Sequence, residues 1–252
     1  ISLLRLSEPL PDSKISNPWA LRSSVPISKE ILKLIRTLRG VKSPLRNLEI
    51  FAGNIEEDSG QEVAALVASF PNLKTLKFQG FNLLITETDL QALKTVISKV
   101  NTLQSLDLYY NSKLLSNPLE ILSFFHQLPN LTTLNMIISS KPIEYSMAEG
   151  FANCLAKLSQ VKDLDLCFTC FVHSPKISSQ ILHGVGQMVQ LRNLKCRLLN
   201  LKKVEDTCGL LEDAFDKLSE LKGLSLTLTS SDIPQNNEHL KPAILWSHLL
   251  SG

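Results

Sequence analysis

A short apolar pattern recurs seven times along the chain at an almost constant interval. The eight-residue segments begin at residues 45, 73, 103, 131, 161, 191 and 221, so successive copies start 28 or 30 residues apart. The copies follow the pattern L-x-x-L-x-L. Position 1 is leucine or valine, position 4 is leucine in all seven copies, and position 6 is an apolar residue. A regular repeat of this length uses one structural unit again and again, and each unit buries its apolar face against its neighbours. The chain is therefore predicted to be a repeat protein.

Within each copy, positions 4, 6 and 8 are apolar or small and alternate with variable residues. The position-4 leucines are Leu48, Leu76, Leu106, Leu134, Leu164, Leu194 and Leu224. A period of two residues is typical of a strand that buries one face. We therefore expect one strand per copy, with positions 4, 6 and 8 in the core and positions 3, 5 and 7 on the opposite face of the sheet.

The segments between these strands have a helical period, because apolar residues recur at i, i+4, i+7 and i+8. The expected helices cover residues 61–70, 88–100, 146–158, 178–188 and 204–218, and one more follows Asn117 and Pro118. Ser146 and Glu149 have the spacing of a capping box at the start of helix 146–158. Each repeat is thus predicted to contain one strand and one helix.

This pattern resembles the leucine-rich repeat family over about residues 45–228, and its long, helix-containing repeats resemble the ribonuclease-inhibitor type. The resemblance implies an α/β solenoid that is curved, with a parallel sheet on its concave side and helices on its convex side. The family usually has asparagine or cysteine at position 9 of the repeat. Here only Asn111 fits that column. We therefore expect the strands to continue through position 8, without a regular asparagine ladder.

Three segments organise the chain: residues 1–44 as an irregular N-terminal repeat, residues 45–229 as six to seven repeats, and residues 230–252 as a C-terminal loop and helix. Ile1, Leu4 and Leu6 have the spacing of an eighth strand. A proline- and serine-containing insertion at 7–26 and a helix at 27–38 would follow that strand. We expect the last segment to be a cap or the start of a further repeat, and the natural protein to extend beyond both ends.

Charge and cysteine content exclude several classes of protein. The chain has 26 Lys and Arg against 24 Asp and Glu, a formal net charge of +2, which is too small to favour binding to nucleic acid. No stretch approaches the roughly 18 uncharged apolar residues of a membrane span, so membrane insertion is not expected. Five scattered cysteines do not resemble the paired framework of a small secreted protein. We expect an intracellular, cytoplasmic protein.

The sequence contains no catalytic or cofactor motif. It has no G-x-S-x-G elbow, P-loop or dinucleotide-binding glycine pattern, so no enzyme, cofactor or small-molecule substrate is expected. Cys167, Cys170 and His173 could begin a zinc site, but no second ligand pair completes it. The repeat register instead places Cys167 on the strand surface and Cys196 in the core. No metal site is therefore expected.

The outward columns of the repeat supply the candidate binding residues. Position 3 holds Asn47, Thr75, Ser105, Thr133, Asp163, Asn193 and Gly223; position 5 holds Glu49, Lys77, Asp107, Asn135, Asp165, Lys195 and Ser225; position 7 holds Phe51, Gln79, Tyr109, Ile137, Cys167, Arg197 and Thr227. Interface energy concentrates on a few aromatic and charged side chains. The candidates for partner binding on the concave face are Phe51, Lys77, Asp107, Tyr109, Ile137, Asp163, Asp165, Lys195 and Arg197. Of these, Phe51, Tyr109 and Ile137 are expected to be exposed apolar anchors. Alternatively, Asp165 and Lys195 only pair across a solvated sheet.

Three functions are consistent with these features. The first is a non-catalytic scaffold for protein–protein interaction, as a subunit or segment of a larger assembly with one or more protein partners. The second is substrate recognition in an F-box-type ubiquitin ligase, because residues 25–38 are similar to the start of an F-box helix. The third is a ligand-sensing or inhibitor domain. The sequence does not decide which protein is bound.

Overall fold

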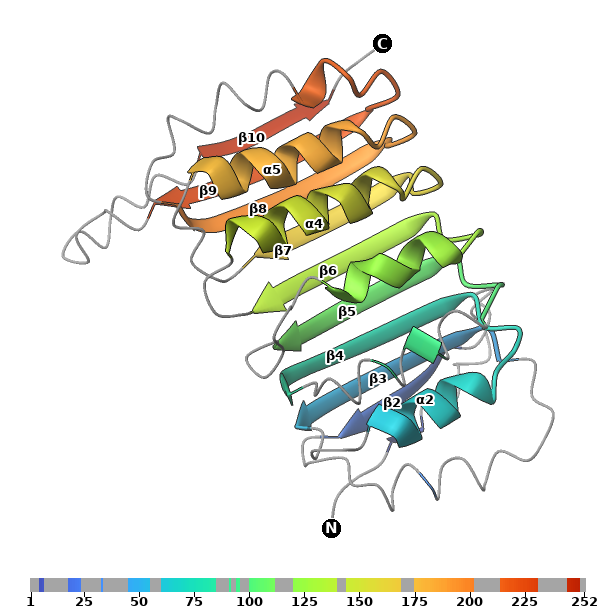
Figure 1. The fold of residues 1–252 in the computed structure, drawn as a ribbon. Coiled ribbons are helices and arrows are strands. Elements are labelled where there is room, and N and C mark those ends of the chain that lie inside the picture. Colours follow the sequence, from blue (N-terminus) through green and yellow to red (C-terminus); the bar gives the residue numbers. More distant parts are fainter. Residues whose placement is uncertain are drawn as a thin grey trace. The chain divides into compact units, whose positions relative to one another are not determined.

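The computed structural model describes residues 5–6, 18–23, 33, 45–54, 60–84, 91, 94–95, 100–111, 120–139, 144–168, 175–201, 214–230 and 244–249. The chain divides into two compact units. The first unit comprises Ile1–Ser116 and Gln127–Leu131, and the second comprises Asn117–His126 and Thr132–Gly252. Each unit is α/β and is built on parallel strands (Figure 1).

In the first unit, five strands are paired in the order in which they occur in the sequence. They are β1 (Arg5–Leu6), β2 (Pro18–Ser23), β3 (Asn47–Asn54), β4 (Thr75–Leu84) and β5 (Ser105–Asn111). Strands β2 to β5 run parallel, and β1 is antiparallel to β2. Helix α2 (Gly60–Ala68) connects β3 to β4 and covers one face of this sheet (Figure 1).

The second unit repeats this arrangement. Its strands are β6 (Thr133–Ser139), β7 (Asp163–Phe168), β8 (Asn193–Leu201), β9 (Gly223–Ser230) and β10 (Ile244–Leu249). Strands β6 to β9 run parallel, and β10 is antiparallel to β9. Helices α4 (Tyr145–Ala156) and α5 (Pro175–Gly186) lie side by side over one face (Figure 1). We call the sheet face opposite the helices the open face in each unit.

Strand pairing within each unit follows the repeat position for position. Leu48 pairs with Leu76 in the first unit, and Leu164 pairs with Leu194 in the second. The expected strands, their parallel direction and their burial at positions 4 and 6 are confirmed, although Leu224 is only partly buried. Strands β3 to β9 all reach position 8, as expected from the lack of an asparagine ladder, and β3, β4, β8 and β9 continue at least two residues further.

Among the described residues, the same turn leads into the strand in six of the repeats. The backbone N–H at position 1 donates to the carbonyl three residues earlier, as in Leu73 to Phe70 and Leu191 to Met188, over 2.8–3.2 Å. In five of these repeats the N–H groups at positions 2 and 3 both donate to the position-2 carbonyl of the preceding repeat, for example Lys162 and Asp163 to Thr132. These bonds recur within both units and satisfy the backbone where each strand begins.

Apolar side chains fill the space between helices and strands. In the second unit, the ring of Phe151 on α4 meets the ring of Phe168 on β7 edge-on, with centroids 5.3 Å apart. Both side chains are buried, as are Ala152 and Leu155 on the same helix face. This ring contact joins helix α4 to the strand that follows it in the sequence.

Several helices differ from expectation. The segment after Asn117 is a 3-10 helix, η1 (Glu120–Gln127), and its period of three residues places the buried Leu122 and Phe125 on one face. The expected helices at 61–70, 146–158 and 178–188 are confirmed. The predicted capping box is wrong, because α4 begins one residue earlier and its N-cap, Glu144, makes no side-chain capping hydrogen bond. Most residues of the helices expected at 27–38, 88–100 and 204–218 lie outside the described part of the chain.

The expectations for both ends of the chain need correction. The parallel neighbour of β3 is not the segment that starts at Ile1 but β2, inside the expected 7–26 insertion, where Trp19 lies beside Leu48. Of residues 1–6, Arg5 and Leu6 form a strand, but it is antiparallel. Residues 244–249 are strand β10, whereas a helix was expected there. In both places pairing with the exposed edge of a strand outweighs the local pattern, because an unpaired edge leaves backbone groups without partners.

Candidate functional site

The open face of the second unit brings together side chains that are about thirty residues apart in the sequence. Because β6 to β9 pair in register, position 5 of each strand forms a row of adjacent residues: Asn135, Asp165, Lys195 and Ser225. The same pairing aligns position 3 as the row Thr133, Asp163, Asn193 and Gly223. Polar side chains from four separate repeats therefore occupy one surface.

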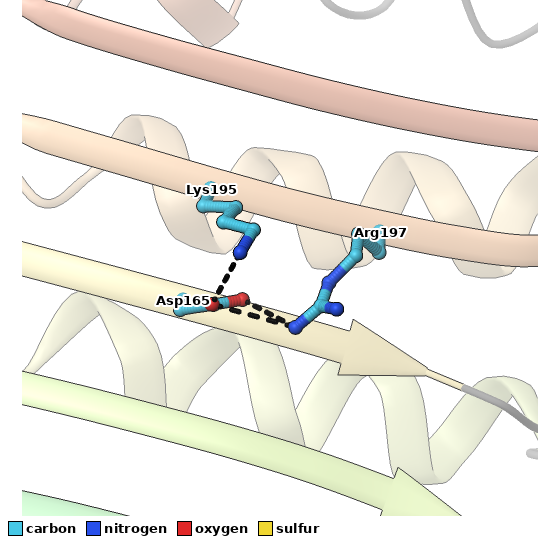
Figure 2. Close-up of polar contacts among 3 residues, drawn as sticks. All are labelled: Asp165, Lys195 and Arg197. Atoms are coloured by element: carbon cyan, nitrogen blue, oxygen red, sulfur yellow. Dashed lines mark hydrogen bonds and ion pairs between the residues drawn. The ribbon is translucent and has the colours of Figure 1, made fainter. Parts of the chain in front are cut away.

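Asp165 is the centre of a three-residue ion cluster (Figure 2). The Lys195 Nζ lies 3.3 Å from its Oδ2, and the Arg197 Nη2 lies 3.1 Å from its Oδ1 and 3.4 Å from its Oδ2. The three side chains keep between 23% and 49% of their surface exposed. The predicted cross-strand pair of Asp165 and Lys195 is confirmed. Water weakens an ion pair this exposed, so the cluster orients its side chains more than it stabilises the fold.

Asp163 is held in a different way. Its Oδ1 accepts a hydrogen bond from the Asn193 Nδ2, and its Oδ2 accepts a longer one of 3.4 Å from the Thr133 hydroxyl. Among the described residues, no cation lies within ion-pair distance of this carboxylate. The amide oxygen of Asn193 points the other way, over Gly223, where a Cβ atom would come within 2.5 Å of it.

A hollow of about 410 Å³ opens on this face. Its lining residues are Asn135, Asp163, Leu164, Asp165, Asn193, Leu194, Lys195, Gly223, Leu224 and Ser225. It combines three of the predicted residues (Asp163, Asp165 and Lys195) with others that the sequence argument passed over. The sequence did contain a signal for these residues. Gly223 is the only glycine at position 3 of the seven repeats, and Asn193 holds position 3 of the preceding repeat. Because glycine has no side chain, Gly223 leaves a space at its place in the row of polar position-3 residues.

The open face of the first unit carries a second ion cluster. The Lys77 Nζ lies 3.2 Å from the Glu49 Oε1 and 4.0 Å from the Asp107 Oδ2. All three are position-5 residues of adjacent strands, so they form one row across β3, β4 and β5. Both carboxylates are mostly covered, with 17% and 14% of their side-chain surface exposed.

The apolar candidates are less exposed than expected. Tyr109 on β5 and Ile137 on β6 are half-buried. Within each unit, neighbouring strands lie only about 4.8 Å apart, so the side chains of one row cover part of one another's surface. Phe51 lies on β3, but its side chain lies outside the described residues.

Cys167 is also buried, with 5% of its surface exposed, although its position on the open face predicted a surface residue. It lies between Ile137 and Arg197 in the position-7 row, and both neighbours are larger. Cys196 is in the core, as predicted. Burial, reinforced by Cys167 and Asp165, raises the pKa of the Cys196 thiol to about 12.

Metal chemistry gains no support from these cysteines. Within the described ranges, no three His, Cys, Asp or Glu side chains are grouped so that they could hold a metal ion. The two other members of the candidate zinc site, Cys170 and His173, lie outside those ranges.

Two further findings concern the chain as a whole. Among the residues that the structure describes, every helix is too short or too polar to cross a bilayer. Comparison of the sequence with protein-family models and with curated proteins gives no match.

Proposed function

We propose that this chain is a non-catalytic protein-binding module of the leucine-rich repeat type, and that its repeats stack as a curved solenoid. The support for this repeat type is the agreement between the L-x-x-L-x-L pattern and the recurrent turn that leads into the strands. In this proposal the chain acts inside the cell, as a subunit or segment of a larger assembly.

The observation that carries the proposed function is the ordered polar surface of the open face. The second unit presents Asp163, Asp165, Lys195 and Arg197 from two adjacent strands, and internal hydrogen bonds and ion pairs orient these side chains. Side chains that are already oriented lose less entropy when a partner binds. Charges of both signs side by side favour a partner with a matching pattern over a uniformly charged one.

The shape of this surface favours a protein partner over a small substrate. The hollow is bordered by side chains from four parallel strands, and no element described by the structure covers it. Small-molecule sites usually enclose most of the ligand surface, whereas protein interfaces spread over a broad area and combine charged groups with a few apolar anchors. Half-buried Ile137, in the position-7 row of this face, can serve as such an anchor.

Affinity capture from the native source, with mass spectrometry, tests this function. We would compare the wild type with a variant carrying Tyr109→Ala, Asp165→Lys and Lys195→Glu on the open faces. A matched control carries Glu149→Gln and Lys157→Gln on the helix side, where both residues are exposed. We expect the open-face variant to lose one stoichiometric partner that the control retains. Retention of every partner by the open-face variant would show that the proposed surface is wrong.

A further inference from the structure

The charges around the hollow of the second unit do not cancel locally. Asp165 faces two cations, Lys195 and Arg197, so that cluster has one positive charge more than it has negative charges. Asp163 accepts only from the neutral Asn193 and Thr133, and no cation of the described residues lies within ion-pair distance of its carboxylate. One end of the hollow therefore has the unmatched negative charge of Asp163. The other end is lined by Asp165 and Lys195, which form a cluster with Arg197 outside the lining, and this cluster has the surplus positive charge.

The negative end also offers an additional acceptor. The Asn193 amide donates to Asp163 through its Nδ2, which turns its Oδ1 toward β9 and over Gly223. A Cβ at residue 223 would lie 2.5 Å from that oxygen, so only glycine leaves the oxygen this position. A carboxylate and an amide oxygen on adjacent strands of one face suit a group with several N–H donors in one plane. Arginine presents five such donors, whereas lysine presents a point charge.

We infer that the hollow binds a protein segment that places an arginine over Asp163 and Asn193 and an acidic side chain over Lys195. This inference rests on the proposed function and identifies the chemistry of its partner. The guanidinium donates to the Asp163 carboxylate and to the Asn193 Oδ1, and the acidic side chain accepts from the Lys195 ammonium. The segment thus supplies one charge of each sign, and both local imbalances are removed.

The geometry of the strand defines the spacing in the partner. Asp163 and Asp165, and likewise Asn193 and Lys195, are two residues apart on one strand, which corresponds to roughly 6.6 Å. An extended partner segment with arginine and an acidic residue two positions apart has its two charges at the same spacing and on one face. Nucleic acid presents mainly its anionic phosphate backbone, which would repel the Asp163 carboxylate instead of supplying it with a cation.

Selection from a random twelve-residue phage-display library against the wild-type chain tests the inference. We expect the enriched peptides to share arginine two positions from aspartate or glutamate, in either order. The enriched peptides are then synthesised with the arginine replaced by citrulline, which keeps the shape and removes the charge. We expect this change to weaken binding at least about tenfold, as for loss of a charge-assisted hydrogen bond.

Variants of the protein locate the site. Asp163→Asn removes the negative charge, and Gly223→Val fills the space below the Asn193 oxygen with a residue that suits a strand. Both are expected to weaken binding of the enriched peptide at least about tenfold, while Glu149→Gln on the exposed side of α4 leaves it unchanged. Circular dichroism verifies that each variant is folded. The Asp163→Asn result decides the matter if Gly223→Val does not fold.

Failure of this inference is distinguishable from failure of the proposed function. If no peptide is enriched, if enriched peptides lack the charge pair, or if Asp163→Asn binds them as the wild type does, the inference is wrong. The proposed function still stands in that case if the open-face variant loses its native partner. If that variant retains every native partner, the proposed function itself fails, whatever the peptides show.

Discussion

At the residue scale, burial in this protein depends on the size of neighbouring side chains as much as on the face of the strand. Cys167 belongs to the open face, yet larger neighbours in its row cover it. Cys196, the next strand's position-6 residue, lies on the core side and is fully buried. Neither thiol is placed for surface chemistry, because a reactive cysteine needs both exposure and a lowered pKa.

Cys196 gives a pH-dependence that can be measured. Its thiol has a pKa of about 12 in the folded chain, against 9.0 as its ordinary value. Between these two values the unfolded chain loses the proton and the folded chain keeps it, so stability falls as the pH rises. Relative to a Cys196→Ala variant, we expect the wild type to lose up to about 1.4 kcal/mol of unfolding free energy per pH unit above pH 9. Urea unfolding between pH 8 and 11 measures this difference, and equal slopes for the two proteins would contradict it.

Ser178 on α5 is a second residue whose burial is expected to lower the stability of the folded chain. It is fully buried, and its hydroxyl has no hydrogen-bond partner among the described residues. The corresponding residue of α4, thirty positions earlier, is the equally buried Ala148. We expect Ser178→Ala to stabilise the chain by about 1–3 kcal/mol, the usual cost of a buried unpaired polar group.

Chemical denaturation of the Ser178→Ala variant measures this gain. Ser179→Ala, at the partly exposed neighbouring position, is the matched control and should change stability by less than about 0.5 kcal/mol. Destabilisation by Ser178→Ala would contradict the prediction, because it would show that the hydroxyl is not an unpaired buried group.

At the scale of elements, helices α4 and α5 approach each other through small residues. A Cβ atom on Gly184 would lie 2.6 Å from the Cα and 2.8 Å from the carbonyl oxygen of Ala152. Both of these are backbone atoms, so a rotamer change cannot relieve the overlap. Close contact of the two helices keeps the repeats at the spacing that strand pairing requires.

Two glycine substitutions test this contact. Gly184→Ala should destabilise the chain by about 1–3 kcal/mol, because the helices must move apart to admit the methyl group. Gly150→Ala on α4 has open space around its Cβ and should stabilise the chain by about 0.5–1 kcal/mol through better helix propensity. Thermal or urea unfolding of both variants provides the comparison. Opposite signs are the expected result, and stabilisation by both would contradict the close contact.

The sequence predicted elements well where the repeat is regular. The alternation of apolar and variable residues correctly predicted the strands from β3 to β9, because each of these strands buries one face. It missed β2, where Trp19 occupies the position of the leucine, and it assigned a helix to the segment that forms β10. Both strands are defined by pairing with a neighbour that is distant in sequence, and local patterns do not carry that information.

At the scale of the whole molecule, the candidate site could be predicted only in part. The columns identified Asp163, Asp165 and Lys195, because register alone determines which residues share a face. They did not reveal the hollow, which depends on Gly223 and on the rotamer of Asn193. They also did not show that Asp165 is shared by two cations, because distances between side chains decide that.

Photo-crosslinking in the native source tests the central claim, that the open face binds a protein partner. A photoreactive phenylalanine analogue is placed either at Ser225, on the open face beside Lys195, or at Asn153, on the exposed side of α4. We predict that illumination joins a partner protein to the chain labelled at position 225 and not to the chain labelled at position 153. An adduct that forms only from position 153, or from neither position, would contradict the claim.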